Sequence, residues 1–174
     1  MLKEDHETTG DELFAMQDGH VVRVRRIRPD DSERLREFHG RLSERSQRLR
    51  FFGAMKRLRE SLADRLTTVD FVDRAAFVVS EPGDDAIHGV GRYERIDRVS
   101  AEVAFVVEDS YQGQGLATEL LYHLASHARR QGIARFTAVT LVENRVMIEV
   151  FARSGFPMTV KMDPPVDEIT LAIG

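Results

Sequence analysis

The stretch from Ala101 to Ala117, AEVAFVVEDSYQGQGLA, constrains the fold more than any other part of this chain. Its apolar run 103–107 is typical of a buried strand, and after a turn Gly113 and Gly115 lead directly into a helical pattern. Such a loop gathers unpaired backbone N–H groups and the positive end of a helix dipole at one point. This arrangement favours phosphate binding. Two glycines separated by one residue are also common in ordinary tight turns, so the loop alone leaves both interpretations open.

The helix predicted from about Gly113 to Gln131 is long enough to be a crossover connection between two parallel strands. Its apolar residues recur at a helical period, at Leu116, Leu120, Leu121, Leu124 and Ala128. Two arginines and Gly132 mark its end. The next strand, Phe136–Val142, is therefore expected to lie parallel to the strand that precedes the glycine loop.

Shorter patterns predict the elements before this unit. Val21–Ile27 alternates apolar residues with arginines, as a strand with one wet face does. Asp30 or Asp31 is placed to cap a helix. The segment Leu42–Phe52 is interpreted as a break followed by a docked aromatic turn, and a second helix is predicted over about Lys56–Leu66.

Two further strands, Ala75–Ser80 and Ile87–Tyr93, are separated by a hairpin turn of proline, glycine and aspartates. Consecutive strands joined by short turns must be antiparallel. Near the end of the chain, Asn144 is placed to cap a helix that stops at Gly155, and two short strands follow. The sequence predicts an α/β (α+β) fold with a mixed, mostly antiparallel sheet of six to seven strands, a parallel central pair and about four helices.

Length and composition fit one globular domain. The chain has 174 residues, of which 42% are hydrophobic and 31% are charged. Residues 1–19 are polar and aperiodic, so we expect a flexible tail with a possible short strand at Leu13–Met16, followed by a folded domain over 20–174. There is no cysteine, which excludes disulfides and thiolate chemistry. No apolar run suits a signal peptide or a membrane span, so a cytoplasmic location is expected.

Charge is distributed unevenly along the chain. The net charge is −4, which argues against general affinity for nucleic acid. Residues 23–59, however, hold 13 Lys or Arg against 5 Asp or Glu. This excess is typical of a solvated, arginine-rich helix surface, and it also suits a docking surface for an acidic partner or for the phosphates of a cofactor.

The run Gln112-Gly113-Gln114-Gly115-Leu116-Ala117 resembles the Gln/Arg-x-x-Gly-x-Gly/Ala signature of the GNAT superfamily of N-acetyltransferases. A second signature of that family is similar to the segment from Asn144 through Phe151 to Gly155 and Phe156. The resemblance covers about residues 20–173. It extends to the acetyltransferase domain of bacterial protein lysine acetyltransferases that inactivate acyl-CoA synthetases. In those proteins the domain is often fused to a regulatory domain, and we expect no such regulation here, because 174 residues leave no room for a second domain.

The resemblance implies that acetyl-CoA is the co-substrate and that no metal is needed. The loop N–H groups would hold the pyrophosphate of acetyl-CoA, and the preceding strand would pair with its pantetheine arm. The residues expected to bind acetyl-CoA are Ala104, Phe105, Val106, Gln112, Gly113, Gln114, Gly115, Leu116, Ala117, Asn144 and Phe151.

The chemistry of acetyl transfer requires a base, because a primary amine with a pKa near 10.4 is almost entirely protonated at neutral pH. Glu102 matches the glutamate that has this role in the resembling subgroup, although a strand-end glutamate in a salt bridge is the alternative. A backbone N–H of Phe105 or Val106 would stabilise the oxyanion. Many family members have a tyrosine general acid where this chain has Phe151, so thiolate departure would rely on water or on the proton of the amine.

The sequence therefore predicts an N-acetyltransferase that forms a ternary complex with acetyl-CoA and a primary amine. A protein lysine is the preferred acceptor, for example on an acyl-CoA synthetase. A small amine or amino acid is an alternative acceptor, and a non-catalytic acetyl-CoA sensor is an alternative function. The protein is expected to be a monomer or a homodimer. His123 and His127 have the i, i+4 spacing of a metal pair but no HExxH glutamate, so they are interpreted as part of a wet helix face.

Overall fold

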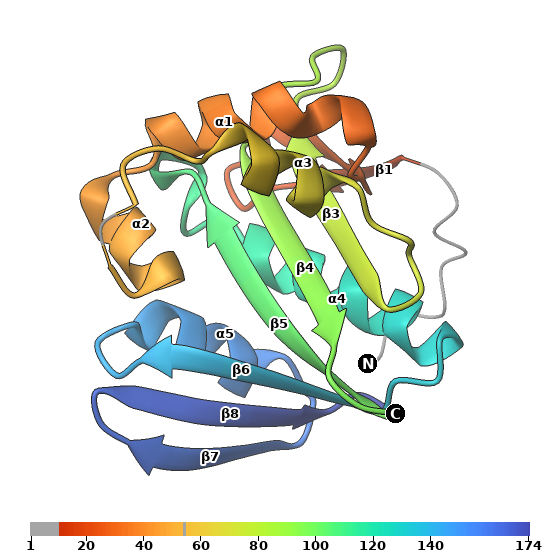
Figure 1. Cartoon of the computed structure of the whole chain (residues 1–174), viewed down its shortest axis with the longest axis vertical. Helices are drawn as coiled ribbons and strands as arrows, with labels where there is room; N and C mark the ends of the chain where they lie inside the picture. The colour runs from red at the N-terminus through yellow and green to blue at the C-terminus, as the bar shows by residue number, and fades with distance from the viewer. Residues whose placement is uncertain (1–10, 54) are drawn as a thin grey trace.

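The computed structural model describes residues 11–53 and 55–174, which form one eight-stranded mixed sheet with helices on both faces (Figure 1). The strands lie in the order β1-β2-β3-β4-β5-β6-β8-β7. Their bounds are β1 Glu12–Ala15, β2 Val21–Arg26, β3 Arg74–Ser80, β4 Gly89–Arg95, β5 Ser100–Val107, β6 Arg135–Leu141, β7 Met158–Asp163 and β8 Val166–Ala172. The α-helices are α1 Ser32–Arg41, α2 Glu44–Phe51, α3 Glu60–Thr67, α4 Leu116–Arg130 and α5 Arg145–Arg153. None of the helices in these two ranges is long and apolar enough to cross a membrane.

The predicted parallel pair is β5 and β6, joined by the α4 crossover, and every other pair of neighbouring strands is antiparallel. This confirms the predicted fold class. The parallel pairing is short, because only Ser100–Glu102 of β5 pairs with Arg135–Thr137 of β6. Beyond Glu102 the two strands diverge, as Figure 1 shows between the green β5 and the blue β6.

Two hydrophobic cores cover the two faces of the sheet. On one face α4 packs Leu120 and its neighbours against Val103 and Phe105 of β5. On the other face α1 and α3 pack against residues that include Val106. Side chains alternate between the faces of a strand, so Glu102 lies on the same face as Val106, the face that α1 and α3 cover.

The segment interpreted as a break and an aromatic turn is the helix α2, so that prediction was wrong. Ser43 is the N-cap, and its Oγ accepts a hydrogen bond from the Ser46 N–H at 3.1 Å. Asp109, which is distant in the sequence, stabilises this cap. Its carboxylate accepts hydrogen bonds from the Ser43 N–H and from the hydroxyls of Ser43 and Ser46. This contact across more than 60 residues stabilises a short helix that local sequence alone does not indicate.

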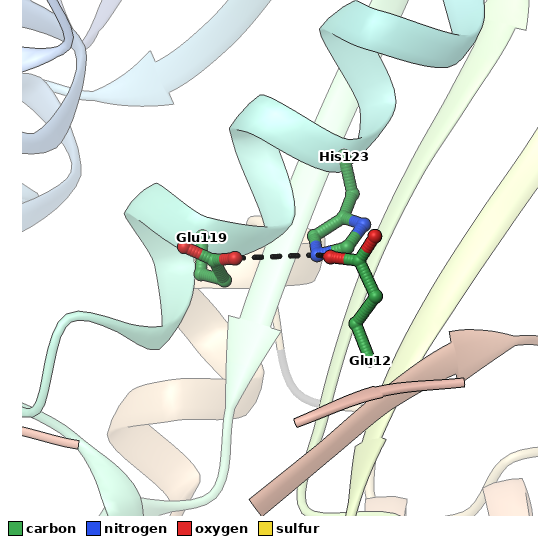
Figure 2. A group of neighbouring side chains, drawn as sticks. All are labelled: Glu12, Glu119 and His123. Carbon is green, nitrogen blue, oxygen red and sulfur yellow. Dashed lines mark ion pairs between the residues drawn. The ribbon is translucent and has the colours of Figure 1, made fainter. Parts of the chain in front are cut away.

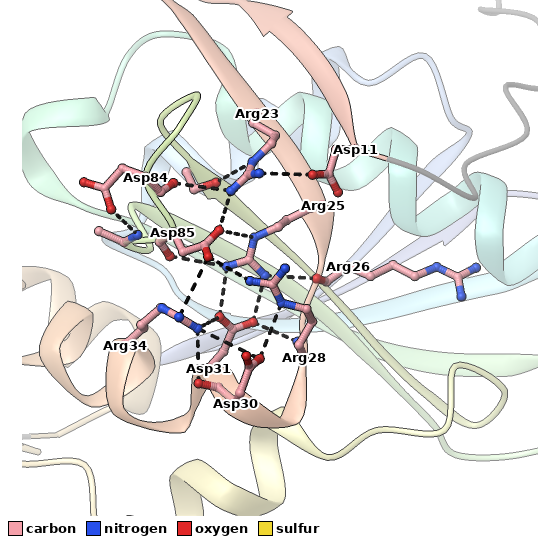
Figure 3. A network of polar contacts seen from close by, with 12 residues as sticks. Asp11, Arg23, Arg25, Arg26, Arg28, Asp30, Asp31, Arg34, Asp84 and Asp85 are labelled. Atoms are coloured by element: carbon pink, nitrogen blue, oxygen red, sulfur yellow. Dashed lines mark hydrogen bonds and ion pairs between the residues drawn. The ribbon is translucent and has the colours of Figure 1, made fainter.

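The arginine face predicted to be wet on β2 is partly buried, which corrects that expectation. Arg25 is 1% exposed and donates two hydrogen bonds to Asp31, of 2.8 and 2.9 Å (Figure 3). Asp31 is 0% exposed, so both side chains of the pair are buried. The Asp31 carboxylate also accepts from the Arg28 N–H and from Arg34, and makes no side-chain cap to α1. A buried carboxylate with this many donors is stable as an anion.

Much of the positive charge of residues 23–59 is paired within the fold. Arg23 contacts Asp85 at 2.5 Å, and Arg41 contacts Glu108 at 3.1 Å. Arg48 forms an ion pair with Glu143. The carboxylates come from distant parts of the sequence, so the local excess of arginine reflects tertiary ion pairs.

The N-terminal strand expected at Leu13–Met16 is present as β1, which pairs with β2 and adds an eighth strand to the six or seven predicted. The first ten residues of the expected tail lie outside the described residues. The division of the chain into a tail over 1–19 and a domain over 20–174 stays a prediction.

Candidate functional site

The N-terminus of α4 presents a row of backbone donors. Gly113 and Gly115 have φ values of +74° and +90°, which turn the chain from β5 into the helix and which L-residues rarely adopt. The first helical acceptor is Gly115 O, which bonds the Glu119 N–H at 3.1 Å. Among the described residues, the N–H groups of 113–118 have no hydrogen-bond acceptor. The loop can therefore hold a phosphate or diphosphate.

Two glutamine side chains of the loop brace it against the rest of the fold. Gln112 Nε2 donates to Val107 O at 2.9 Å and to Ser46 Oγ at 3.2 Å, which joins β5 to α2. The Gln114 side-chain Oε1 accepts the N–H of Asp18 at 3.1 Å, and the Gln114 backbone O accepts the N–H of Gln17, in the turn after β1. These side chains shape the loop, while the backbone provides the donors.

A cleft opens where β5 and β6 diverge, with α2 and α5 forming its other walls. It is lined by Leu49, Arg50, Phe52, Glu102, Val103, Ala104, Phe105, Ala138, Val139, Thr140, Asn144, Met147 and Phe151. The predicted base therefore shares one cleft with four of the residues expected to bind acetyl-CoA: Ala104, Phe105, Asn144 and Phe151.

The edge of β5 that faces this cleft carries backbone groups without a partner strand. The Glu108 N–H donates toward β4, to His88 O. Because successive residues of a strand direct their N–H and C=O groups to opposite edges, Val106 also faces β4, and Phe105 faces the open edge. Val107 O, on the same open edge, accepts from Gln112. Of the two oxyanion donors expected from the sequence, only the Phe105 N–H is directed toward the cleft.

Positive charge surrounds the carboxylate in the cleft. Glu102 is exposed and lines the cleft with Arg50 of α2. Burial lowers the pKa of Arg50, and the Glu102 charge opposes that shift. Behind Arg50 a second cavity also contains Arg92, whose pKa is lowered by burial and then by the charges of Arg50 and Arg74. Both guanidinium groups stay charged at neutral pH.

Asn144 and Phe151 hold the α5 wall of the cleft. Asn144 caps α5 as predicted, because its Oδ1 accepts the Met147 N–H at 3.3 Å. Phe151 is 1% exposed and meets Phe105 edge to face, with ring centroids 6.0 Å apart. Its ring closes the base of the cleft and has no proton to give.

The structure separates some predicted cofactor residues from the cleft itself. The Leu116 side chain is in the core beneath α4, so only its backbone belongs to the loop. Val106 packs into the core under α1 and α3. The sequence analysis missed Arg50, because nothing distinguishes it from the many other arginines of the chain, and it placed Phe52 only at the end of a docked aromatic turn. Phe52 lines the cleft and is 48% exposed.

The helix face with His123 and His127 is not wet, which corrects the sequence interpretation. The two residues are 5% and 3% exposed. His127 shares a 2.7 Å hydrogen bond with Phe71 O, and burial lowers its pKa. Among the described residues, the potential metal ligands grouped with His123 do not include His127, so the two rings do not form the metal pair that their spacing allows.

A row of N–H donors at a helix end, a strand with a free edge and a carboxylate in the adjoining cleft are compatible with an acetyl-CoA-dependent N-acetyltransferase, and the family match shows this class. Residues 41–156 match the family described as Acetyltransferase (GNAT) family. The chain belongs to this family, and acetyl-CoA is its co-substrate.

Relatives agree with this assignment. The chain is 35% identical over 145 residues to the acetyltransferase PA5475 of Pseudomonas aeruginosa, covering 82% of this chain and 78% of that protein. It is 30% identical over 163 residues to the acetyltransferase Pat of Mycolicibacterium smegmatis, covering 87% of this chain and 48% of Pat. The chain thus spans about half the length of Pat. The fold superimposes on the GNAT domain of S. lividans PAT with a TM-score of 0.86 and 36% identity, covering 93% of this chain and 96% of that chain.

Proposed function

We propose that this protein acetylates a lysine side chain of another protein, with Glu102 as the general base. The observation that carries the proposal is the position of Glu102, exposed in the cleft at the point where β5 and β6 diverge. The similarity to the GNAT domain of S. lividans PAT and to Pat supports a protein acceptor. In this proposal the expected cofactor residues other than Val106 hold acetyl-CoA between the α4 loop and the free edge of β5.

The chemistry begins with removal of a proton from the lysine ammonium. Its pKa near 10.4 leaves about one molecule in 2,500 neutral at pH 7, so Glu102 takes the proton directly or through water. The charges of Arg50 and Arg92 repel an ammonium and favour the neutral amine. The amine nitrogen then bonds to the thioester carbon, and the Phe105 N–H donates to the oxyanion.

Collapse of the tetrahedral intermediate breaks the carbon–sulfur bond and releases CoA thiolate. Its pKa resembles that of cysteine, about 8.5, so the thiolate leaves without a strong acid. The second amine proton passes to water or to the departing sulfur, and Phe151 takes no part in this step. The products are an amide on the lysine and CoA.

Exposed apolar side chains around the cleft support a macromolecular acceptor. Phe52, the residue after α2, is 48% exposed, Val139 of β6 is 38% exposed, and both line the cleft. An apolar rim around a polar centre is typical of a surface that binds another protein. A small amine needs no such rim.

The test is release of CoA thiol from acetyl-CoA in the presence of a purified acyl-CoA synthetase, with spermidine and free amino acids in parallel reactions. We expect turnover with the protein, and a loss of kcat of about 10²–10⁴-fold in Glu102→Gln at unchanged acetyl-CoA affinity. Glu94→Gln is the matched control, because Glu94 is directly opposite Glu102 on β4 and does not line the cleft.

Each other result identifies one of the alternatives. Turnover of small amines without turnover of any protein would contradict the lysine acceptor and leave an N-acetyltransferase of small molecules. Tight binding of acetyl-CoA without thiol release for any amine would favour the sensor. Equal losses of kcat in Glu102→Gln and Glu94→Gln would contradict the proposed role of Glu102 as the general base.

A further inference from the structure

Three side chains unconnected with acetyl transfer converge between β1 and α4. Glu12 comes from β1, and Glu119 and His123 lie one turn apart on α4 (Figure 2). One donor atom from each lies within 4.8 Å of the other two. The His123 side chain is 5% exposed, Glu119 is 12% exposed and Glu12 is 32% exposed. The His123 end of the group is therefore buried, and solvent reaches it at Glu12.

Within the described part of the chain, the His123 ring lacks hydrogen bonds at both nitrogens. Neither Nδ1 nor Nε2 has a hydrogen-bond partner among residues 11–53 and 55–174, although both atoms are buried. The ring is instead packed on Phe77, with centroids 5.6 Å apart. A buried polar group without a partner is costly, so such a group in a native fold calls for an explanation.

The distances around Nε2 differ from those of a hydrogen bond. Nε2 is 3.3 Å from Glu119 Oε1 and 3.4 Å from Glu12 Oε2, and Figure 2 shows it between the two carboxyl groups. Among the described residues, two other histidine–glutamate pairs, His20 with Glu81 and His88 with Glu108, have contacts of 2.7 Å. Those two pairs are ordinary charge-assisted hydrogen bonds. The longer contacts leave room for an atom between the ring and the oxygens.

The separations match those between ligands of one small metal ion. With metal–ligand bonds of about 2.0–2.2 Å, two ligands of a tetrahedral zinc ion lie about 3.3–3.6 Å apart. A neutral imidazole and two carboxylates carry two negative charges, which balance a dication. We propose that Glu12, Glu119 and His123 bind a divalent transition-metal ion of the zinc class, with water completing its coordination.

The ion would fasten the N-terminal hairpin to the helix that begins at the phosphate loop. The turn after β1 already bonds that loop, since Gln17 N–H and Asp18 N–H donate to Gln114. Phe14 of β1 also faces Gly115, at 3.7 Å from the position of a Cβ there. The site is therefore structural, it holds β1 against the cofactor loop, and it takes no part in the acetyl transfer proposed above. The competing arrangement has no ion, and His123 contacts the two carboxylates directly.

The test is titration of tag-free, full-length protein, stripped of metal with a chelator, by Co²⁺ at neutral pH. Bound Co²⁺ is detected by its visible ligand-field absorption, and competition with Zn²⁺ gives the zinc affinity. We expect one saturable Co²⁺ per chain and a Kd at least about tenfold higher in Glu12→Gln and Glu119→Gln. Zn²⁺ should also raise the Tm of the wild type and not that of Glu12→Gln.

Glu81→Gln is the matched control, since it removes a carboxylate from a histidine pair that is hydrogen-bonded. It should leave the Co²⁺ affinity unchanged. Glu12 is partly exposed on an edge strand, so its variant is expected to fold, which circular dichroism checks. An absence of saturable binding, or equal affinity of wild type and Glu12→Gln, would overturn the proposal and leave direct contact of His123 with the two carboxylates. None of these readouts depends on acetyl transfer.

Discussion

Phe151 and Glu102 line the same cleft, and only Glu102 can exchange a proton. Introducing the missing hydroxyl tests whether thiolate departure limits the reaction. We expect kcat of Phe151→Tyr to stay within about threefold of the wild type, because a thiol of pKa near 8.5 leaves without a general acid. Steady-state thiol release across the neutral pH range measures this. A rise of tenfold or more would mean that the wild type lacks a needed acid.

Asp31 is the residue on which the N-terminal half of the fold depends. Burial alone would raise its pKa, but hydrogen bonds from Arg25, from the Arg28 N–H and from Arg34 together hold the pKa below its ordinary value. A carboxyl group with a depressed pKa in the folded state stabilises the fold above its unfolded pKa, near 3.8, and loses this effect as pH falls through the folded value.

Replacing Asp31 with Asn should lower the free energy of unfolding by about 3–5 kcal/mol at neutral pH, because it leaves Arg25 charged and buried. Asp30→Asn, one residue away and exposed, should change it by less than about 0.5 kcal/mol. Urea unfolding at neutral and acidic pH measures both. The Asp31 variant should also lose part of the acid dependence of the wild type, and equal stability of the two variants would refute the role of the pair.

Arg25 and Asp31 show how far the sequence alone predicts structure at the scale of single residues. The signature residues and the N-cap Asn144 are local patterns, so the sequence predicted their positions correctly. Arg25 looked like a solvent-facing strand residue, because its period matched Arg23 and its partner Asp31 looked like a helix cap. Only the fold shows that the two side chains meet.

Among the elements, α4 and its glycine loop are the best predicted and the most testable. Gly115 lies at the start of α4 and Gly132 just beyond its end, both at positive φ, and a Cβ at Gly132 would meet nothing within 4 Å. Gly115→Glu should raise the Kd for acetyl-CoA by at least about 100-fold, because it places a carboxylate against phosphate. Gly132→Glu introduces a similar backbone strain away from the loop and should bind acetyl-CoA with the affinity of the wild type.

Isothermal titration with acetyl-CoA compares the two variants, and their Tm values check that both are folded. Equal affinities of the two variants for acetyl-CoA would contradict binding of the diphosphate at the N-terminus of α4. The helix was predictable because its apolar period and stop signals are local. By contrast, α2 was missed because Ser43 needs Asp109, 66 positions later, to complete its cap. A short helix held by tertiary contacts has weak local signals.

At the scale of the whole molecule, the sheet consists of two parts held together by a three-residue parallel contact. The sequence predicted the parallel pair from the length of the crossover helix. It could not predict where the pairing stops, because that depends on how α2, α5 and the strands pack around the cleft. The divergence beyond Glu102 gives the molecule both a free strand edge and an opening beside a carboxylate.

The most direct measurement is a crystal structure of the protein with bound CoA. The diphosphate is predicted to accept hydrogen bonds from N–H groups of residues 113–118, and the pantetheine arm is predicted to pair with β5 at Phe105. The sulfur would then lie in the cleft within reach of Glu102. A nucleotide bound away from the head of α4, or a sulfur far from Glu102, would contradict the account.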